Sequence, residues 1–155
     1  MIRKLRASDM QAVLAIWLEG NLQAHPFISA SYWKDNQPFV AEALPKAEVY
    51  IYERKGEIIA FAGLQGNHIA GLFVRQKDRS KGIGHALMAY LQQRHKTLTL
   101  CVYEKNERAL KFYREKGFQA TQKRQDNANG EYEYIMDWTA KSEPENGSTA
   151  AAPKQ

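Results

Sequence analysis

The chain has 155 residues, which suits a single domain. Hydrophobic residues make up 44% and charged residues 25%, so we expect a folded core and exclude wholesale disorder. The formal charge of +5 favours an anionic partner, but it is spread along the chain and gives a nucleic-acid-binding function little support. The single cysteine, Cys101, excludes an intrachain disulfide framework and a multi-cysteine zinc site.

Signals for export or membrane insertion are lacking in the pattern. No apolar h-region follows residues 1–6, and no stretch approaches the ~18 apolar residues of a membrane span. The four histidines show no paired spacing typical of a metal site. We therefore expect a cytoplasmic protein with no membrane partner and no metal.

The first elements are predicted from capping and helical periodicity. Residues 1–6 alternate weakly and predict a short strand. Ser8 and Asp9 are expected to cap a helix that runs to about Leu22.

A second helix is predicted after a break at Pro26. Either Ser29 or Ser31 is expected to cap it, and Pro45 is expected to stop it after about Leu44.

Three consecutive strands follow. Residues 49–53 and 58–64 flank the turn at 55–57 and predict a hairpin. Residues 68–74 are apolar on both faces, which is typical of a central strand.

The second half alternates helices and strands. The expected elements are a glycine turn at 79–84 with a helix to about 94, a strand at 98–102, a helix at 106–116, strands at 118–124 and 131–138, and a disordered C-terminal tail at 141–155. The order β-α-α-β-β-β-α-β-α-β-β predicts an α/β fold in residues 1–140, in which a mixed sheet carries helices on both faces.

The glycine turn carries the clearest chemical signal. Gly82 and Gly84 lie between a strand and a helix, where glycines let a ligand approach the backbone closely. The free N–H groups of the first helical turn and the positive end of the helix dipole favour a pyrophosphate there. Arg79 and Lys81 add positive charge.

Three other interpretations compete for this turn. A Walker phosphate loop requires Gly-Lys-Ser/Thr, whereas His85 and Ala86 follow Gly84. A dinucleotide-binding fingerprint requires a further glycine where Leu87 stands. A plain turn that only starts a helix stays open.

Two blocks of this sequence resemble the GNAT N-acetyltransferase family. Arg79-x-x-Gly82-x-Gly84 matches the family signature Gln/Arg-x-x-Gly-x-Gly/Ala at the same strand-to-helix junction. Residues 106–118 resemble the family's later segment, N-x-x-A-x-x-F-Y-x-x-x-G-F. The resemblance covers residues 1–138 and is closest to short, single-domain bacterial members.

The resemblance implies an N-acetyltransferase that moves an acetyl group from acetyl-CoA to a primary amine by direct attack in a ternary complex. The fourth strand would hold the pantetheine arm through its main chain, and Tyr113 would protonate the departing sulfur. The residues implied in cofactor binding are Leu72, Phe73, Val74, Arg79, Lys81, Gly82, Ile83, Gly84, His85, Ala86 and Asn106.

The general base is less defined. Relatives place a glutamate either at the position of Cys101 or at that of His68. An imidazole can take a proton, so His68 is the candidate base, and a nearby glutamate such as Glu104 stays open. Cys101 is more typical of a small core residue than of an acyl-carrying nucleophile.

The acceptor pocket of this family is built by the first two helices and their loop. Here that region supplies the aromatic candidates His25, Phe27, Tyr32 and Trp33, some of which are expected to fill the core. The identity of the amine stays open, as does the choice between a monomer and a homodimer. A non-catalytic acetyl-CoA-binding sensor or interaction module is the alternative function.

Overall fold

The computed structural model describes residues 1–141, so the predicted tail lies almost entirely outside the described residues. The helices are α1 (Met10–Ala24), α2 (Ala30–Ala43), α3 (Ile83–Arg94) and α4 (Glu107–Glu115). The strands are β1 (Ile2–Lys4), β2 (Glu48–Arg54), β3 (Glu57–Gln65), β4 (His68–Val74), β5 (Thr97–Tyr103), β6 (Gln119–Gln125) and β7 (Tyr132–Thr139). The predicted element order and mixed α/β class are confirmed.

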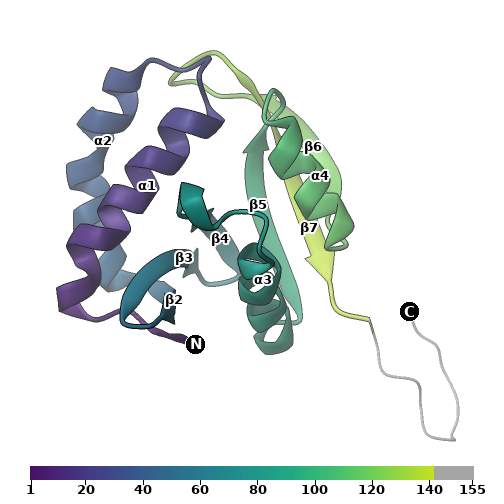
Figure 1. The fold of residues 1–155 in the computed structure, drawn as a ribbon. Helices are drawn as coiled ribbons and strands as arrows, with labels where there is room; N and C mark the ends of the chain where they lie inside the picture. The colour runs from purple at the N-terminus through teal and green to yellow at the C-terminus, as the bar shows by residue number, and fades with distance from the viewer. Residues whose placement is uncertain (142–155) are drawn as a thin grey trace, which may run out of the picture.

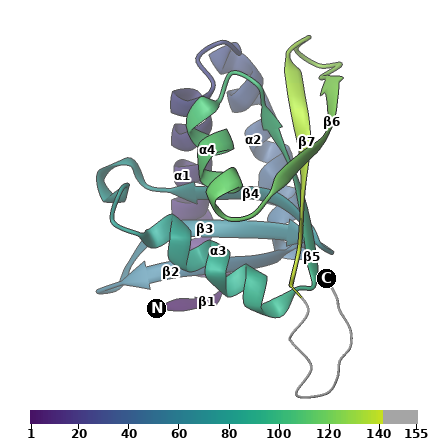
Figure 2. The same cartoon turned by 90° about the vertical axis from the view of Figure 1, so that its right-hand side faces the viewer.

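The strands form one seven-stranded sheet in the order β1-β2-β3-β4-β5-β7-β6. The β4–β5 pair is parallel and the other neighbouring pairs are antiparallel. Helices α1 and α2 cover one face, and α3 and α4 lie on the other (Figures 1 and 2). Strands β2 to β4 run across the view of Figure 2 whereas β5, β6 and β7 run up it, so the sheet bends sharply between β4 and β5.

Each face of the sheet has its own hydrophobic core. Leu87, Leu91 and Leu100 belong to the core beneath α3 and α4, and all three are at most 2% exposed. Val13 and Ile51 belong to the core beneath α1, and both are fully buried. Since full burial of such a side chain is worth about 1.5–3 kcal/mol, these two layers fix the helices on the sheet.

The predicted cap at residues 8–9 is wrong. A short 3₁₀ turn (Ala7–Asp9) precedes α1, and the Asp9 side chain makes no cap hydrogen bond to the helix. Its carboxylate instead accepts hydrogen bonds from Arg3 Nη1 at 2.8 Å and from the Arg6 backbone N–H at 2.7 Å. The guanidinium of Arg3 supplies a charged partner that a cap position would lack, and this contact depends on the folded β1 strand.

The other helix ends follow their local sequence. Ser29, rather than Ser31, caps α2, because its Oγ accepts from the Ser31 backbone N–H. Asn106 caps α4 by accepting from the Ala109 backbone N–H at 3.2 Å. Gly117 follows α4 with φ +94°, a conformation that strongly favours glycine.

Candidate active site

Strands β4 and β5 separate soon after they meet. Their parallel ladder joins His68 to Thr99 and Ile69 to Leu100, and it ends there. A register shift in the β3–β4 pair, between Gly63 and Leu64, adds a bulge in β4 at the same level. The backbone groups at residues 70–74 therefore lie on an edge beside the gap, where an extended ligand can pair with them.

The gap opens into a cavity of about 920 Å³. Its walls come from the end of α1 and the loop after it, from β4, from the glycine turn, from β5 and from α4. The predicted site residues that line it are His25, Phe27, Trp33, Leu72, Phe73, Val74, Arg79, Gly82, Ile83, Gly84, His85, Asn106 and Tyr113. Segments that are distant in sequence thus meet around one hollow.

Four predicted site residues lie outside the cavity lining. His68 starts β4 beside Gln65 and Thr99, on the paired side of the split. Tyr32 packs edge-on against the Trp33 ring on the far side from the cavity lining, with ring centroids 4.9 Å apart. Ala86 is in the second half of the first turn of α3, past the residues that line the cavity.

Lys81 is the fourth residue outside the lining. Its Nζ lies 3.5 Å from Asp78 Oδ1, beneath the turn. The buried carboxylate attracts the ammonium, so the side chain is directed away from the cavity.

The glycine turn adopts the backbone that its sequence predicts. Gly82 has φ +83° and Ser80 has φ +65°, so the chain makes two left-handed steps before α3 begins at Ile83. The first helical hydrogen bond runs from Ala86 N–H to Gly82 C=O at 3.0 Å. The N–H groups of the preceding helical positions have no helical partner and border the cavity.

Basic side chains stand beside this helix end. Arg79 Nε donates to the Val74 carbonyl at 3.3 Å, which holds the half-buried guanidinium at the end of β4. Burial and the nearby charge of Arg108 lower the pKa of Arg79. The two arginines repel one another, so an anion between them would relieve the repulsion.

Tyr113 lies on the α4 wall of the cavity. Its half-buried ring packs edge-on between Phe112 and Phe118, with centroid distances of 5.3 and 5.7 Å. Burial raises the pKa of the phenol to about 12. The hydroxyl therefore keeps its proton at neutral pH, as a proton donor must.

Asn106 joins the acceptor loop to α4. Its Oδ1 accepts from the Ala109 backbone N–H, and its Nδ2 lies 3.3 Å from His25 Nε2. An amide nitrogen only donates, so His25 Nε2 accepts in this pair. Burial lowers the pKa of His25 to about 4, which agrees with a neutral ring. Both polar groups of Asn106 are thus engaged within the protein.

Aromatic rings form the wall opposite α4. His25 stacks on Trp33 with centroids 5.2 Å apart and meets the Tyr103 ring edge-on at 5.0 Å. Tyr103 was missed by the sequence analysis, although its place at the end of the strand beside the expected gap was a usable signal. Its hydroxyl donates to Asp126 at 2.8 Å, and burial raises its pKa.

Acidic side chains reach the cavity from several elements: Asp78, Glu107, Glu115 and Glu133. Glu133, on β7 opposite Tyr103, was also missed by the sequence analysis. Its carboxylate is 15% exposed and accepts from Arg124 Nε at 2.7 Å. Glu104, by contrast, pairs with Lys123 at 2.8 Å and does not line the cavity.

Cys101 also lines the cavity, beside the Arg124–Glu133 pair. Burial and the charge of Glu133 raise the pKa of its thiol. A thiol is a far weaker nucleophile than a thiolate, so this environment argues against an acyl-cysteine route.

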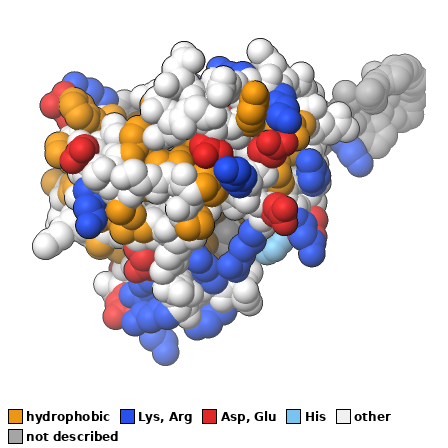
Figure 3. All heavy atoms as spheres, turned by 90° about the horizontal axis from the view of Figure 1, so that it is seen from above, with side chains coloured by type: hydrophobic (Ala, Val, Ile, Leu, Met, Phe, Trp, Pro, Cys, Tyr) orange, Lys and Arg blue, Asp and Glu red, His pale blue; other side chains and the backbone are white. Residues whose placement is uncertain are grey.

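The end of the molecule that carries the loop between α1 and α2 faces the viewer in Figure 3. Hydrophobic side chains reach the surface near its centre, and basic side chains gather along its lower part. Within residues 1–141, no helix is long and apolar enough to cross a membrane.

A gap beside a free strand edge, a glycine turn that opens a helix and a protonated tyrosine share this cavity. The family model of the acetyltransferase (GNAT) domain matches residues 25–138. The chain belongs to the GNAT N-acetyltransferase family. It transfers an acetyl group to an amine, and the similarities favour this enzyme over a non-catalytic binding module.

Named relatives are bacterial. The peptidyl-lysine N-acetyltransferase YiaC of Escherichia coli is 43% identical over 120 residues, which cover 76% of this chain and 82% of YiaC. The peptidyl-lysine N-acetyltransferase YjaB of E. coli is 31% identical over 121 residues, 77% of this chain and 82% of YjaB. The solution structure of apo YjaB has a TM-score of 0.79 at 27% identity and covers 89% of this chain and 96% of its own.

A more distant structure shares the fold. An acetyltransferase from Bacillus anthracis, solved in complex with acetyl coenzyme A, has a TM-score of 0.56 at 24% identity. The match covers 61% of this chain and 62% of that one.

Proposed function

We propose that this enzyme takes its acetyl group from acetyl-CoA and transfers it to the side-chain amine of a lysine in a protein or peptide. The observation that carries the proposal is the meeting of the β4 edge, the glycine turn and Tyr113 in one cavity. The family uses acetyl-CoA, and the relatives at 43% and 31% identity are named for peptidyl-lysine acetylation.

The cofactor roles follow from the walls of the cavity. The pyrophosphate would lie at the start of α3, against the N–H groups of Gly82 to His85 and beside Arg79. The pantetheine arm would pair with the main chain of Leu72 to Val74 along the free β4 edge. Asn106 would support this site mainly by capping the helix that carries Tyr113.

The chemistry needs a neutral amine and a protonated leaving group. The amine nitrogen forms a bond to the thioester carbonyl carbon, the carbon–sulfur bond breaks, and the electron pair leaves with sulfur. Tyr113 O–H donates the proton that the thiolate receives. The amine loses one proton, and Glu133 is the carboxylate on the β5–β7 wall positioned to accept it, directly or through water.

The acceptor would enter along the aromatic wall. The rings of His25, Phe27 and Tyr103 offer apolar surface to the methylene stem of a lysine. The negative charge of Glu133 at the inner end of this wall would attract the cationic head of the side chain.

A titration of acetyl-CoA by calorimetry, run beside a free-thiol release assay, tests this proposal. The acceptors would be a lysine-containing peptide with a blocked N-terminus, the same peptide with norleucine in place of lysine but a free N-terminus, and spermidine. Binding of acetyl-CoA with thiol release on the first peptide supports the proposal. Release on only the second peptide or spermidine overturns the lysine assignment, and absence of acetyl-CoA binding overturns the cofactor site.

A further inference from the structure

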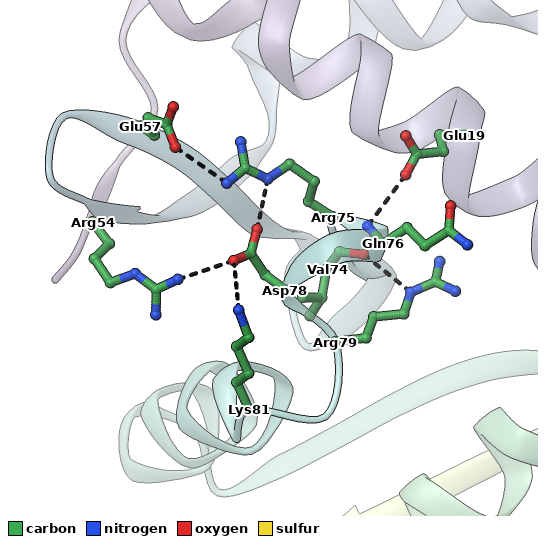
Figure 4. A network of polar contacts seen from close by, with 9 residues as sticks. All are labelled: Glu19, Arg54, Glu57, Val74, Arg75, Gln76, Asp78, Arg79 and Lys81. Atoms are coloured by element: carbon green, nitrogen blue, oxygen red, sulfur yellow. Dashed lines mark hydrogen bonds and ion pairs between the residues drawn. The ribbon is translucent and has the colours of Figure 1, made fainter.

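A buried carboxylate lies beneath the glycine turn. Asp78 is 3% exposed and ends a short 3₁₀ turn (Gln76–Asp78), directly before Arg79. Figure 4 shows three basic side chains that converge on it. Arg75 Nε lies 2.6 Å from Oδ2, while Arg54 Nη2 and Lys81 Nζ lie 2.9 and 3.5 Å from Oδ1.

The three partners come from three different parts of the fold. Arg54 ends β2, Arg75 follows the last residue of β4, and Lys81 precedes α3. Arg75 also reaches Glu57, at the start of β3, at 3.2 Å. One side chain thus ties the β2–β3 hairpin, the exit of β4 and the entry to α3 to a single point.

The turn has a second tether to α1. The Gln76 backbone N–H donates to Glu19 Oε1 at 3.2 Å, and the Gln76 side chain accepts from Gln23 Nε2 at 2.5 Å. With the Asp78 contacts, these bonds hold residues 76–81 on two sides. The residues that follow, Arg79 and the glycines, point to the cavity instead.

The charges within the cluster are unequal. One carboxylate meets three cations, and the exposed Glu57 compensates only part of the excess. The Arg75 guanidinium holds the pKa of Asp78 below its usual range, so the carboxylate stays ionised at neutral pH. Without it, the three cations would repel one another, and the turn between them would lose its anchor.

We propose that Asp78 is a positioning residue for the diphosphate of acetyl-CoA. It acts through the turn: by binding Arg54, Arg75 and Lys81 it fixes the course of residues 79–84, so that Arg79 and the N–H groups at the start of α3 face the cavity. Lys81, which the motif suggests as a phosphate ligand, serves as a partner of Asp78. This inference rests on the proposed cofactor site.

The test compares two acetyl donors. Acetyl-CoA carries the diphosphate, and S-acetylpantetheine has the same thioester without it. For Asp78→Asn, assayed with a short lysine-containing peptide, we expect KM for acetyl-CoA to rise by about 10-fold. We expect kcat to change less than about twofold, and the rate with S-acetylpantetheine to stay at the wild-type value, because the turn contacts only the missing part.

Matched variants separate this role from a general loss of structure. Glu57→Gln removes the second partner of Arg75 and leaves every Asp78 contact, so KM should stay at the wild-type value. Arg54→Gln removes one arm of the cluster and should raise KM for acetyl-CoA by about threefold, and it carries the test if Asp78→Asn fails to fold.

Two results would overturn the role of Asp78: an unchanged or lower KM for acetyl-CoA, or an equal loss of rate with both donors. If the wild type itself used both donors with equal kcat/KM, the proposed diphosphate site would be wrong, whatever the variants did.

Discussion

The ring of Phe73 on β4 lies directly against Gly20 in the middle of α1: a Cβ added at Gly20 would come 2.5 Å from Phe73 Cδ1. A Cβ at Gly71 would come 2.7 Å from Cε2 of the same ring. The ring therefore fills the space left by two glycines and has little room to move. This contact brings α1 close to the strand that borders the cavity.

Gly20→Ala should destabilise the fold, although alanine is normally the better helix former. We expect the free energy of unfolding to fall by about 1–3 kcal/mol, because the ring of Phe73 has to leave its position. Thermal and denaturant unfolding would measure the change. Gly63→Ala is the matched control, since its Cβ would meet only Val49 at an ordinary 3.8 Å. A more stable Gly20→Ala protein would contradict the close packing.

Tyr113→Phe tests the proton donor. The change removes the hydroxyl and keeps the ring between Phe112 and Phe118, so acetyl-CoA affinity should stay within about twofold. We expect kcat to fall by about 100-fold, the lower range for loss of a general acid. Steady-state kinetics beside calorimetry separates the two effects. Unchanged turnover would remove Tyr113 from the mechanism.

Gly84→Glu tests the diphosphate site. A carboxylate at the start of α3 would repel a pyrophosphate and fill the space that it needs, so we expect acetyl-CoA binding to be lost in calorimetry. Gly84→Ala is the control, because its Cβ would meet Phe112 and Val74 at 3.6 and 3.8 Å, which are ordinary contacts. Retained affinity in the glutamate variant would disprove the site.

The base can be tested by two conservative changes. His68 does not line the cavity, so His68→Gln should leave kcat within about twofold of the wild type. Glu133→Gln should lower kcat by about 10-fold or more and remove the acidic limb of the pH–rate profile. Glu131→Gln, which breaks only the ion pair with Lys105, serves as the control for Glu133. The reverse ranking of His68 and Glu133 would restore the histidine as the base.

The buried His25 predicts a pH dependence of stability. Its pKa is about 4 in the folded protein, against 6.5 for an unperturbed histidine, because burial disfavours the charged ring. The unfolded chain therefore binds the extra proton between these values. Stability from this group is complete above about pH 6.5 and is lost as the pH falls toward 4.

The shift corresponds to at most about 3 kcal/mol. His25→Phe removes the titration while keeping an aromatic ring beside Trp33. Denaturant unfolding of both proteins between pH 7 and 4 would measure the difference. Parallel pH profiles would show that His25 does not titrate in this way.

Sequence alone determined the features that depend on a few neighbouring residues. The order of the elements, the cap at Asn106 and the turn at Gly82 follow from periodicity, side-chain capping and the need for positive φ. The hairpin turn is similar: Lys55 and Gly56 both have positive φ, as a two-residue turn between twisted strands requires. The two motifs that resemble the family also lie within short segments, so the order of their residues along the chain is enough to identify them.

The tertiary structure decided which side chains meet. Glu133 enters the site because β7 pairs with β5, and Lys81 turns away from it because Asp78 lies buried beneath the turn. His68 is kept out because the β4–β5 ladder opens only after Ile69. Contacts of this kind join residues far apart in the chain, and their geometry depends on strand register, packing and buried charge, which no local pattern in the sequence specifies.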